Sequence, residues 1–119
     1  MTRTAEIEIE MVTTYDQDAQ PLDYLYQDPE YREQDDARLK AWRNDEWHFV
    51  GIRAKATIKI SYGINAECWI VTELSTPGLW GVESDSGEEL FQQVFQEERE
   101  ILLGMLEPLK KECRVTVRP

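Results

Sequence analysis

The stretch that most constrains the fold of this chain is Ala66–Leu90, with the sequence AECWIVTELSTPGLWGVESDSGEEL. In its first part, Ile70 and Leu74 fall on one side of an extended segment, and Glu67 and Glu73 fall on the other. A period of two is expected for a strand that buries only one face. Residues 66–74 are therefore predicted to form a strand.

The second part of this stretch predicts a turn and a helix. Pro77-Gly78 breaks the strand, and the two glycines on either side of Trp80 predict that at least one of them adopts a positive φ. Ser86 and Glu89 have the spacing of a capping box, which indicates a helix start. Strand, turn and capped helix thus follow one another within 25 residues.

Five further segments show a clear period. Apolar residues on alternate positions predict strands at residues 5–13, 47–61 and 113–118. Asp28-Pro29 has the residue types preferred at a helix start, so a helix is predicted at 29–44. Residues 87–107 show the helical period and precede Pro108, which ends or kinks the helix. The predicted order of elements is β-α-β-β-α-β.

This order predicts an α+β protein in one domain, residues 1–119, with an acidic loop at about 15–28. Such split βαβ units commonly give a four-stranded antiparallel sheet with two helices on one face, the ferredoxin-like arrangement. The strand order would be 4-1-3-2, with the basic last strand beside the acidic row Glu6, Glu8 and Glu10. In the alternative, a simple meander, the basic residues of the strand at 47–61 lie beside that row.

The balance of charge restricts the possible partners. The chain has 24 acidic and 13 basic side chains, and its formal net charge is −11. Such a chain repels nucleic acid and anionic membranes and attracts basic protein surfaces. No apolar run reaches the roughly 18 residues of a membrane span, and the first residues lack a signal-peptide pattern, so we expect a cytoplasmic protein.

The sequence lacks the common motifs for catalysis and for cofactor binding. The string GLWGVESDSG matches neither the phosphate-binding loop nor the dinucleotide fingerprint. One histidine and two cysteines do not make a usual zinc site. We therefore expect no enzyme, no metal and no cofactor. The predicted strand order separates Cys68 from Cys113 by roughly 10 Å, beyond the reach of a disulfide, so both thiols should be free and buried.

Two strings, WHFVGIRAKATIKI and PGLWGVESDSGEEL, are followed by a glutamate-rich helix. Together they resemble a group of small acidic proteins encoded by phages, prophages and plasmids, most of which have no assigned activity. The likeness covers residues 45–107 and transfers no catalytic residue. The resemblance implies a mobile-element setting, in which small acidic proteins often inhibit host defence. Anti-CRISPR and anti-restriction proteins that imitate DNA are among them.

These observations predict a DNA-mimicking inhibitor that binds a basic surface of a host defence complex, such as a CRISPR effector, without contacting nucleic acid or membrane. Aromatic anchors within a polar rim are typical of protein interfaces. The predicted partner-binding residues are Asp16, Asp18, Asp23, Tyr24, Tyr26, Trp80, Glu83, Asp85, Glu88, Glu89, Glu97 and Glu100. The alternative is a small non-catalytic binding or assembly protein of a phage or prophage whose acidity serves solubility. The oligomeric state stays open.

Overall fold

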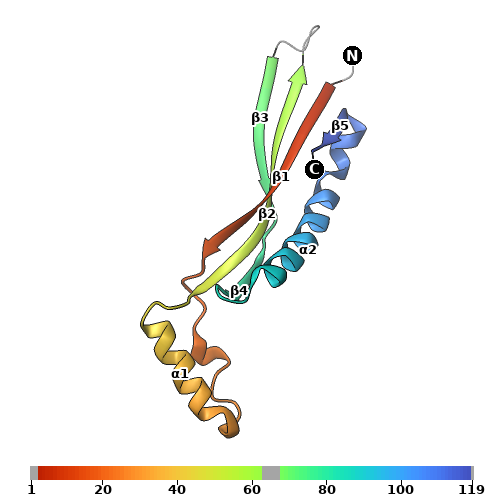
Figure 1. The fold of residues 1–119 in the computed structure, drawn as a ribbon. Helices are drawn as coiled ribbons and strands as arrows, with labels where there is room; N and C mark the ends of the chain where they lie inside the picture. The colour runs from red at the N-terminus through yellow and green to blue at the C-terminus, as the bar shows by residue number, and fades with distance from the viewer. Residues whose placement is uncertain (1–2, 63–67, 119) are drawn as a thin grey trace.

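The computed structural model describes residues 3–62 and 68–118 and has a twisted sheet, one helix packed on the sheet and one helix at its end (Figure 1). Short 3₁₀ helices lie at Pro21–Asp23, Pro29–Tyr31 and Glu107–Lys111. The elements are β1 (Arg3–Tyr15), α1 (Arg32–Arg43), β2 (Phe49–Tyr62), β3 (Cys68–Ser75), β4 (Leu79–Glu83), α2 (Glu88–Leu106) and β5 (Cys113–Val117).

The strand order is β3-β2-β1-β5, and β4 pairs with the beginning of β2. The α+β class is confirmed, but the ferredoxin-like order and the count of four strands are wrong. Strands β1, β2 and β3 are antiparallel, whereas β5 runs parallel to β1. The meander alternative holds for β1–β2–β3, with Glu6 opposite Lys59 and Glu10 opposite Lys55. Alternation reveals which face of a strand is buried, but it does not reveal which strand lies alongside.

Strand β4 is additional to the four predicted strands, and it occupies the segment that was predicted to be a turn. It pairs with β2 through Val82 opposite Val50, and its register shifts next to Gly51. Both predicted hinge glycines have positive φ, 92° at Gly78 and 75° at Gly81, which confirms the expected backbone. The turn is therefore shorter than expected, and Trp80 lies on a strand.

Helix α1 does not lie on the sheet face, contrary to the ferredoxin-like prediction. Figure 1 shows it beyond the end of the sheet, near the start of β2. Its one buried residue is Leu39, so its apolar stripe is too narrow to cover a sheet. The molecule measures 68 × 22 × 21 Å, and its radius of gyration is 20.0 Å. A compact domain of this length has a value of about 13.5 Å, so the chain is strongly elongated.

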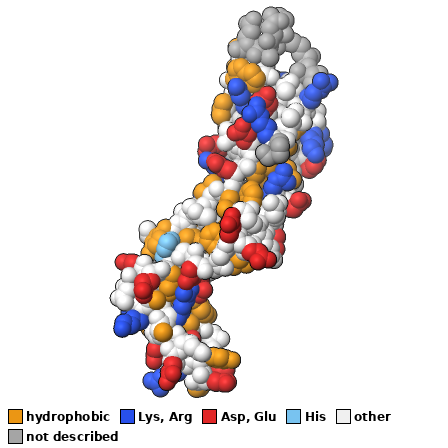
Figure 2. All heavy atoms as spheres, viewed as in Figure 1, with side chains coloured by type: hydrophobic (Ala, Val, Ile, Leu, Met, Phe, Trp, Pro, Cys, Tyr) orange, Lys and Arg blue, Asp and Glu red, His pale blue; other side chains and the backbone are white. Residues whose placement is uncertain are grey.

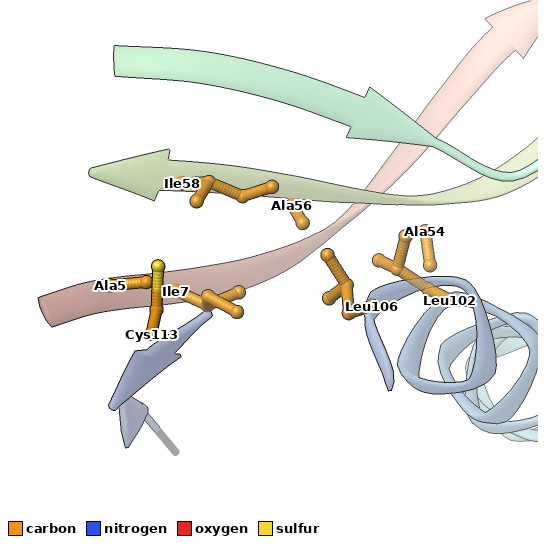
Figure 3. Packing of buried hydrophobic residues seen from close by; sticks show 8 residues of the cluster. All are labelled: Ala5, Ile7, Ala54, Ala56, Ile58, Leu102, Leu106 and Cys113. Carbon is orange, nitrogen blue, oxygen red and sulfur yellow. The ribbon is translucent and has the colours of Figure 1, made fainter. Parts of the chain in front are cut away.

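Helix α2 packs on the sheet and forms the main core. Leu102 and Leu106 point toward Ile7 of β1 and toward two alanines of β2 (Figure 3). Ala54 and Ala56 are fully buried, and their small side chains let the helix lie close to the strand. This packing fixes which side of α2 faces solvent.

Two local predictions are corrected by the structure. The N-cap of α2 is Gly87, and the Ser86 hydroxyl donates to the Glu83 carbonyl oxygen at 2.7 Å, so the predicted capping box does not form. Both cysteines are free, as predicted, and Cys113 is buried, but Cys68 is exposed because it lies on the edge strand β3. Residues 66 and 67 of the predicted strand lie outside the described residues.

Candidate protein-binding surface

Three of the predicted contacts are engaged within the chain, around Arg38 of α1. Arg38 donates to both carboxylate oxygens of Asp85, at 2.6 and 2.7 Å, and to Glu83 at 3.0 Å. The hydrogen bonds from Arg38 lower the pKa of Asp85. The Tyr24 hydroxyl donates to Glu83, and burial together with this hydrogen bond raises the pKa of Tyr24 to about 12. These side chains connect α1 and the 15–28 loop to the end of β4.

The 15–28 loop is also held by hydrogen bonds to α1 and within the loop. The Tyr26 hydroxyl donates to Asp36 at 2.6 Å, and this hydrogen bond is the main cause that raises the pKa of Tyr26. The Tyr26 backbone has a positive φ of 66°, and its N–H donates to Asp35 at 3.1 Å. Asp23 accepts from the Gln20 N–H at 3.1 Å. The predicted contacts Tyr26 and Asp23 therefore have structural partners of their own.

The structure brings Asp16, Asp18 and Trp80 together at a hollow of about 750 Å³. Asp16 is buried, and its carboxylate accepts from the N–H groups of Asp18, Ala19 and Gly81 at 3.0, 3.3 and 2.8 Å. It thus ties the end of β1 to β4. The carboxylate of Asp18 is exposed, and Trp80 is 46% exposed. Asp18 and Trp80 are therefore accessible to a partner, whereas Asp16 is structural.

The remaining four predicted contacts lie on α2. Glu88, Glu89, Glu97 and Glu100 are exposed, and among the described residues their carboxylates make no hydrogen bond or ion pair. Residues three and four apart are neighbours on a helix surface. Glu97 and Glu100 are such neighbours, and at 3.6 residues per turn Glu89 lies about 20° from Glu100 around the helix axis. These three side chains are on the solvent side of the helix, and we call them the α2 acidic row. It is opposite the buried Leu102.

An apolar flank beside the α2 acidic row was not predicted from the sequence. Leu90, Ile101 and Met105 are 40%, 50% and 40% exposed. Ile101 is four residues from Glu97, so apolar and acidic side chains are adjacent. Leu90 and Ile101 fall outside the stripe of buried positions, and a helical projection would have found this signal. The helical period places Met105 on the buried side, and its 40% exposure differs from that expectation.

The acidic row of β1 is largely offset by basic side chains on both sides. Arg118 pairs with Glu6 at 3.0 Å and with Glu8 at 2.9 Å, and Lys55 pairs with Glu10 at 3.1 Å. Figure 2 shows acidic side chains spread along the length of one face, often beside Lys or Arg. On the sheet, therefore, most of the local negative charge is internally compensated.

The chain has no identified relative and no site of a known type among its described residues. No family model, curated protein or solved structure matches the chain. Within residues 3–62 and 68–118, no cluster of three His, Cys, Asp or Glu side chains could hold a metal ion. No helix in the same residues is long and apolar enough to cross a membrane. The resemblance to mobile-element proteins rests on its two sequence motifs and stays a prediction.

Proposed function

We propose that this protein is a non-catalytic inhibitor that docks the outer side of α2 on a basic surface of a partner protein. The observation that carries the proposal is the α2 acidic row, exposed and unpaired among the described residues, beside an apolar flank. A polar rim around an apolar centre is the usual anatomy of a protein interface. The resemblance to phage and plasmid proteins makes a host defence complex, such as a CRISPR effector, the proposed target.

The location on α2 follows from where the charge is not compensated. Glu83 and Asp85 pair with Arg38, and Glu6, Glu8 and Glu10 of β1 have basic partners. Exposed charges that are already paired add little attraction for an incoming surface. Among the twelve residues predicted to bind a partner, the α2 acidic row, Glu88 and Asp18 have exposed carboxylates with no ion pair in the described part of the chain.

The α2 acidic row is too sparse to replace DNA by charge alone. The distance from Glu89 to Glu100 spans about 16 Å of helix axis at about 1.5 Å per residue. Double-stranded DNA carries about ten charges over that length, against three in this row. The carboxylates therefore act mainly by guiding encounter with a cationic groove, which changes the association rate. Leu90 and Ile101 supply the contacts that slow dissociation.

The test compares two variants of equal net charge. The first is Glu89→Lys, Glu97→Lys and Glu100→Lys, and the control is Glu30→Lys, Glu33→Lys and Glu46→Lys, which alters exposed glutamates near α1. Each is assayed for inhibition of DNA cleavage by a panel of purified CRISPR effector and restriction complexes. We expect the first variant to lose inhibition through a slower association rate, while the control keeps most of it.

Two outcomes contradict the proposal. Equal inhibition by both folded variants removes α2 from the interface. Absence of inhibition by the wild type across the panel contradicts the assignment of a host defence complex as the target.

The second candidate function is an assembly protein whose acidity serves solubility. The pairing of acidic with basic side chains on the sheet favours it. In that case the α2 variant keeps its partner and loses only solubility.

A further inference from the structure

Strand β3 is an edge of the sheet with large apolar side chains in solvent. It pairs with β2 on one side, and no strand in the described part of the chain pairs with its other side. Trp69, Ile70 and Val71 are 45%, 51% and 62% exposed. Neighbouring residues on a strand point to opposite faces. Both faces of this edge are therefore apolar and uncovered.

The reason for this exposure is the position of α2. The helix packs on β1 and β2 through Leu102 and Leu106. Of the β3 residues, Leu74 packs against the same core, whereas Trp69, Ile70 and Val71 lie beyond it and stay exposed (Figure 1). Figure 2 shows hydrophobic and basic side chains next to each other at the end of the molecule that holds β3. The elongated shape leaves this edge without cover from the rest of the described chain.

The edge also lacks the features that usually prevent strand pairing. Natural edge strands carry Lys, Pro or bulges that block another strand. Residues Cys68–Ser75 contain no proline, and their one charged side chain is Glu73. Eight residues of extended backbone, about 26 Å at 3.3 Å per residue, are thus available for hydrogen bonds.

We propose that β3 pairs antiparallel with β3 of a second copy of this chain, with Val71 opposite Val71. A twofold axis through this position makes the contact isologous, so each copy contributes the same patch. The two sheets then form one continuous sheet. In this register Trp69 of one copy lies opposite Glu73 of the other, and both are on the face that carries Val71.

The charges favour this register. Lys59 Nζ lies 4.0 Å from the centre of the Trp69 ring in the same chain. Glu73 already lies 3.7 Å from Lys55 Nζ of its own chain, and in the dimer it is also placed opposite Trp69 of the second copy and so beside that copy's Lys59. The contact occurs twice by symmetry, and it offsets part of the repulsion between two chains of net charge −11. A register centred on Glu73 would instead place two carboxylates directly opposite each other, which is unfavourable.

The experiment measures the molar mass of the full chain by analytical ultracentrifugation over a range of concentrations. Wild type is expected to form a dimer. Val71→Lys, which places two ammonium groups at the twofold axis, is expected to raise the dimer dissociation constant by tenfold or more. Thr116→Lys, on the exposed side of the other edge strand, is the control and should leave it unchanged.

A charge exchange tests the register itself. Glu73→Lys alone and Lys59→Glu alone each place like charges together, so each should dimerise more weakly than wild type. An equimolar mixture of the two single variants should form a heterodimer, because both cross-contacts then join opposite charges.

Circular dichroism confirms that each variant is folded. A monomeric wild type at every concentration, or a dimer unaffected by Val71→Lys, overturns the proposal, and failure of the mixture to associate overturns the register. None of these outcomes depends on the inhibitor function of α2.

Discussion

The guanidinium of Arg38 lies 3.7 Å from the centre of the Trp47 ring, and the Trp47 Nε1–H donates to the Arg38 carbonyl oxygen at 3.1 Å. Trp47 is 2% exposed and packs edge-on against Phe49 at the start of β2. The same guanidinium pairs with Asp85 at the end of β4. Because α1 lies beyond the sheet, Arg38 is a principal connection between this helix and the rest of the molecule.

Replacing Arg38 should loosen α1 without unfolding the sheet. In Arg38→Met, the carboxylates of Glu83 and Asp85 lose their cationic partner, and the face of Trp47 loses its cover. We expect the free energy of unfolding of this region to fall by about 1–3 kcal/mol, reduced from the buried case because these groups are partly exposed. Native-state hydrogen exchange of the α1 amides measures it. Arg32→Met, on the exposed side of α1, is the control and should change little.

Acid should weaken the same connection. The pKa of Asp85 is lowered by hydrogen bonds from Arg38, so the folded state favours the charged carboxylate. The resulting stabilisation is complete above the unfolded pKa, about 3.9, and is lost as pH falls through the lower folded value. Trp47 fluorescence should therefore change below about pH 4. Asp85→Asn should remove this dependence, and an unchanged acid transition in that variant would contradict the assignment.

Gly78 in the β3–β4 turn and Gly81 in β4 should differ in their tolerance of a side chain. A Cβ on Gly78 would lie 2.5 Å from Arg53 Cγ and 2.9 Å from the Ile52 carbonyl oxygen, at a positive φ. Gly81 has a positive φ but open space around it. We expect Gly81→Ala to lower the free energy of unfolding by about 1 kcal/mol through backbone strain, and Gly78→Ala to lower it further.

The control for the glycine series is Gly104, which lies in α2 with nothing near its absent Cβ. Alanine there should raise the free energy of unfolding by about 0.5–1 kcal/mol, because helix propensity improves. Urea unfolding measures all three variants. If Gly78→Ala and Gly81→Ala leave the urea midpoint unchanged, the turn is a flexible link rather than a structured one.

The elements of this fold follow from local chemistry, whereas their arrangement does not. Alternation at Ile7 and Ile58 correctly indicated the buried face of β1 and β2, and the helical period correctly indicated α2. The neighbour of each strand depends on pairing between distant residues, and a period of two is compatible with several strand orders. The five-residue strand β4 was missed because Pro77-Gly78 and Gly81 are residues typical of turns.

The sequence predicted where the acidic side chains of the candidate surface lie, but not which of them have a basic partner within the chain. Counting acids correctly indicated carboxylates near Glu83 and along α2, but Arg38 is 45 residues from Glu83 in sequence. Only the fold brings a distant arginine to this carboxylate, so no local pattern indicates which acids are already paired. The exposed edge of β3 was not predicted for the same reason, since its exposure depends on where α2 packs.

Glu98 of α2 occupies a position that its helix would normally give to an apolar side chain. It lies four residues from the buried Val94 and four from Leu102, and it is 7% exposed. Its Oε1 atom is buried and has no hydrogen-bond partner among the described residues. A buried polar atom without a partner costs about 1–3 kcal/mol. Glu98→Met, of similar volume, should therefore raise the free energy of unfolding by about that amount, measured by urea unfolding.

Glu97→Met, on the solvent side of the same helix, is the matched control, and its free energy of unfolding should stay within about 0.5 kcal/mol of wild type. A loss of stability in Glu98→Met would mean that this carboxylate stabilises the packing of α2 on the sheet.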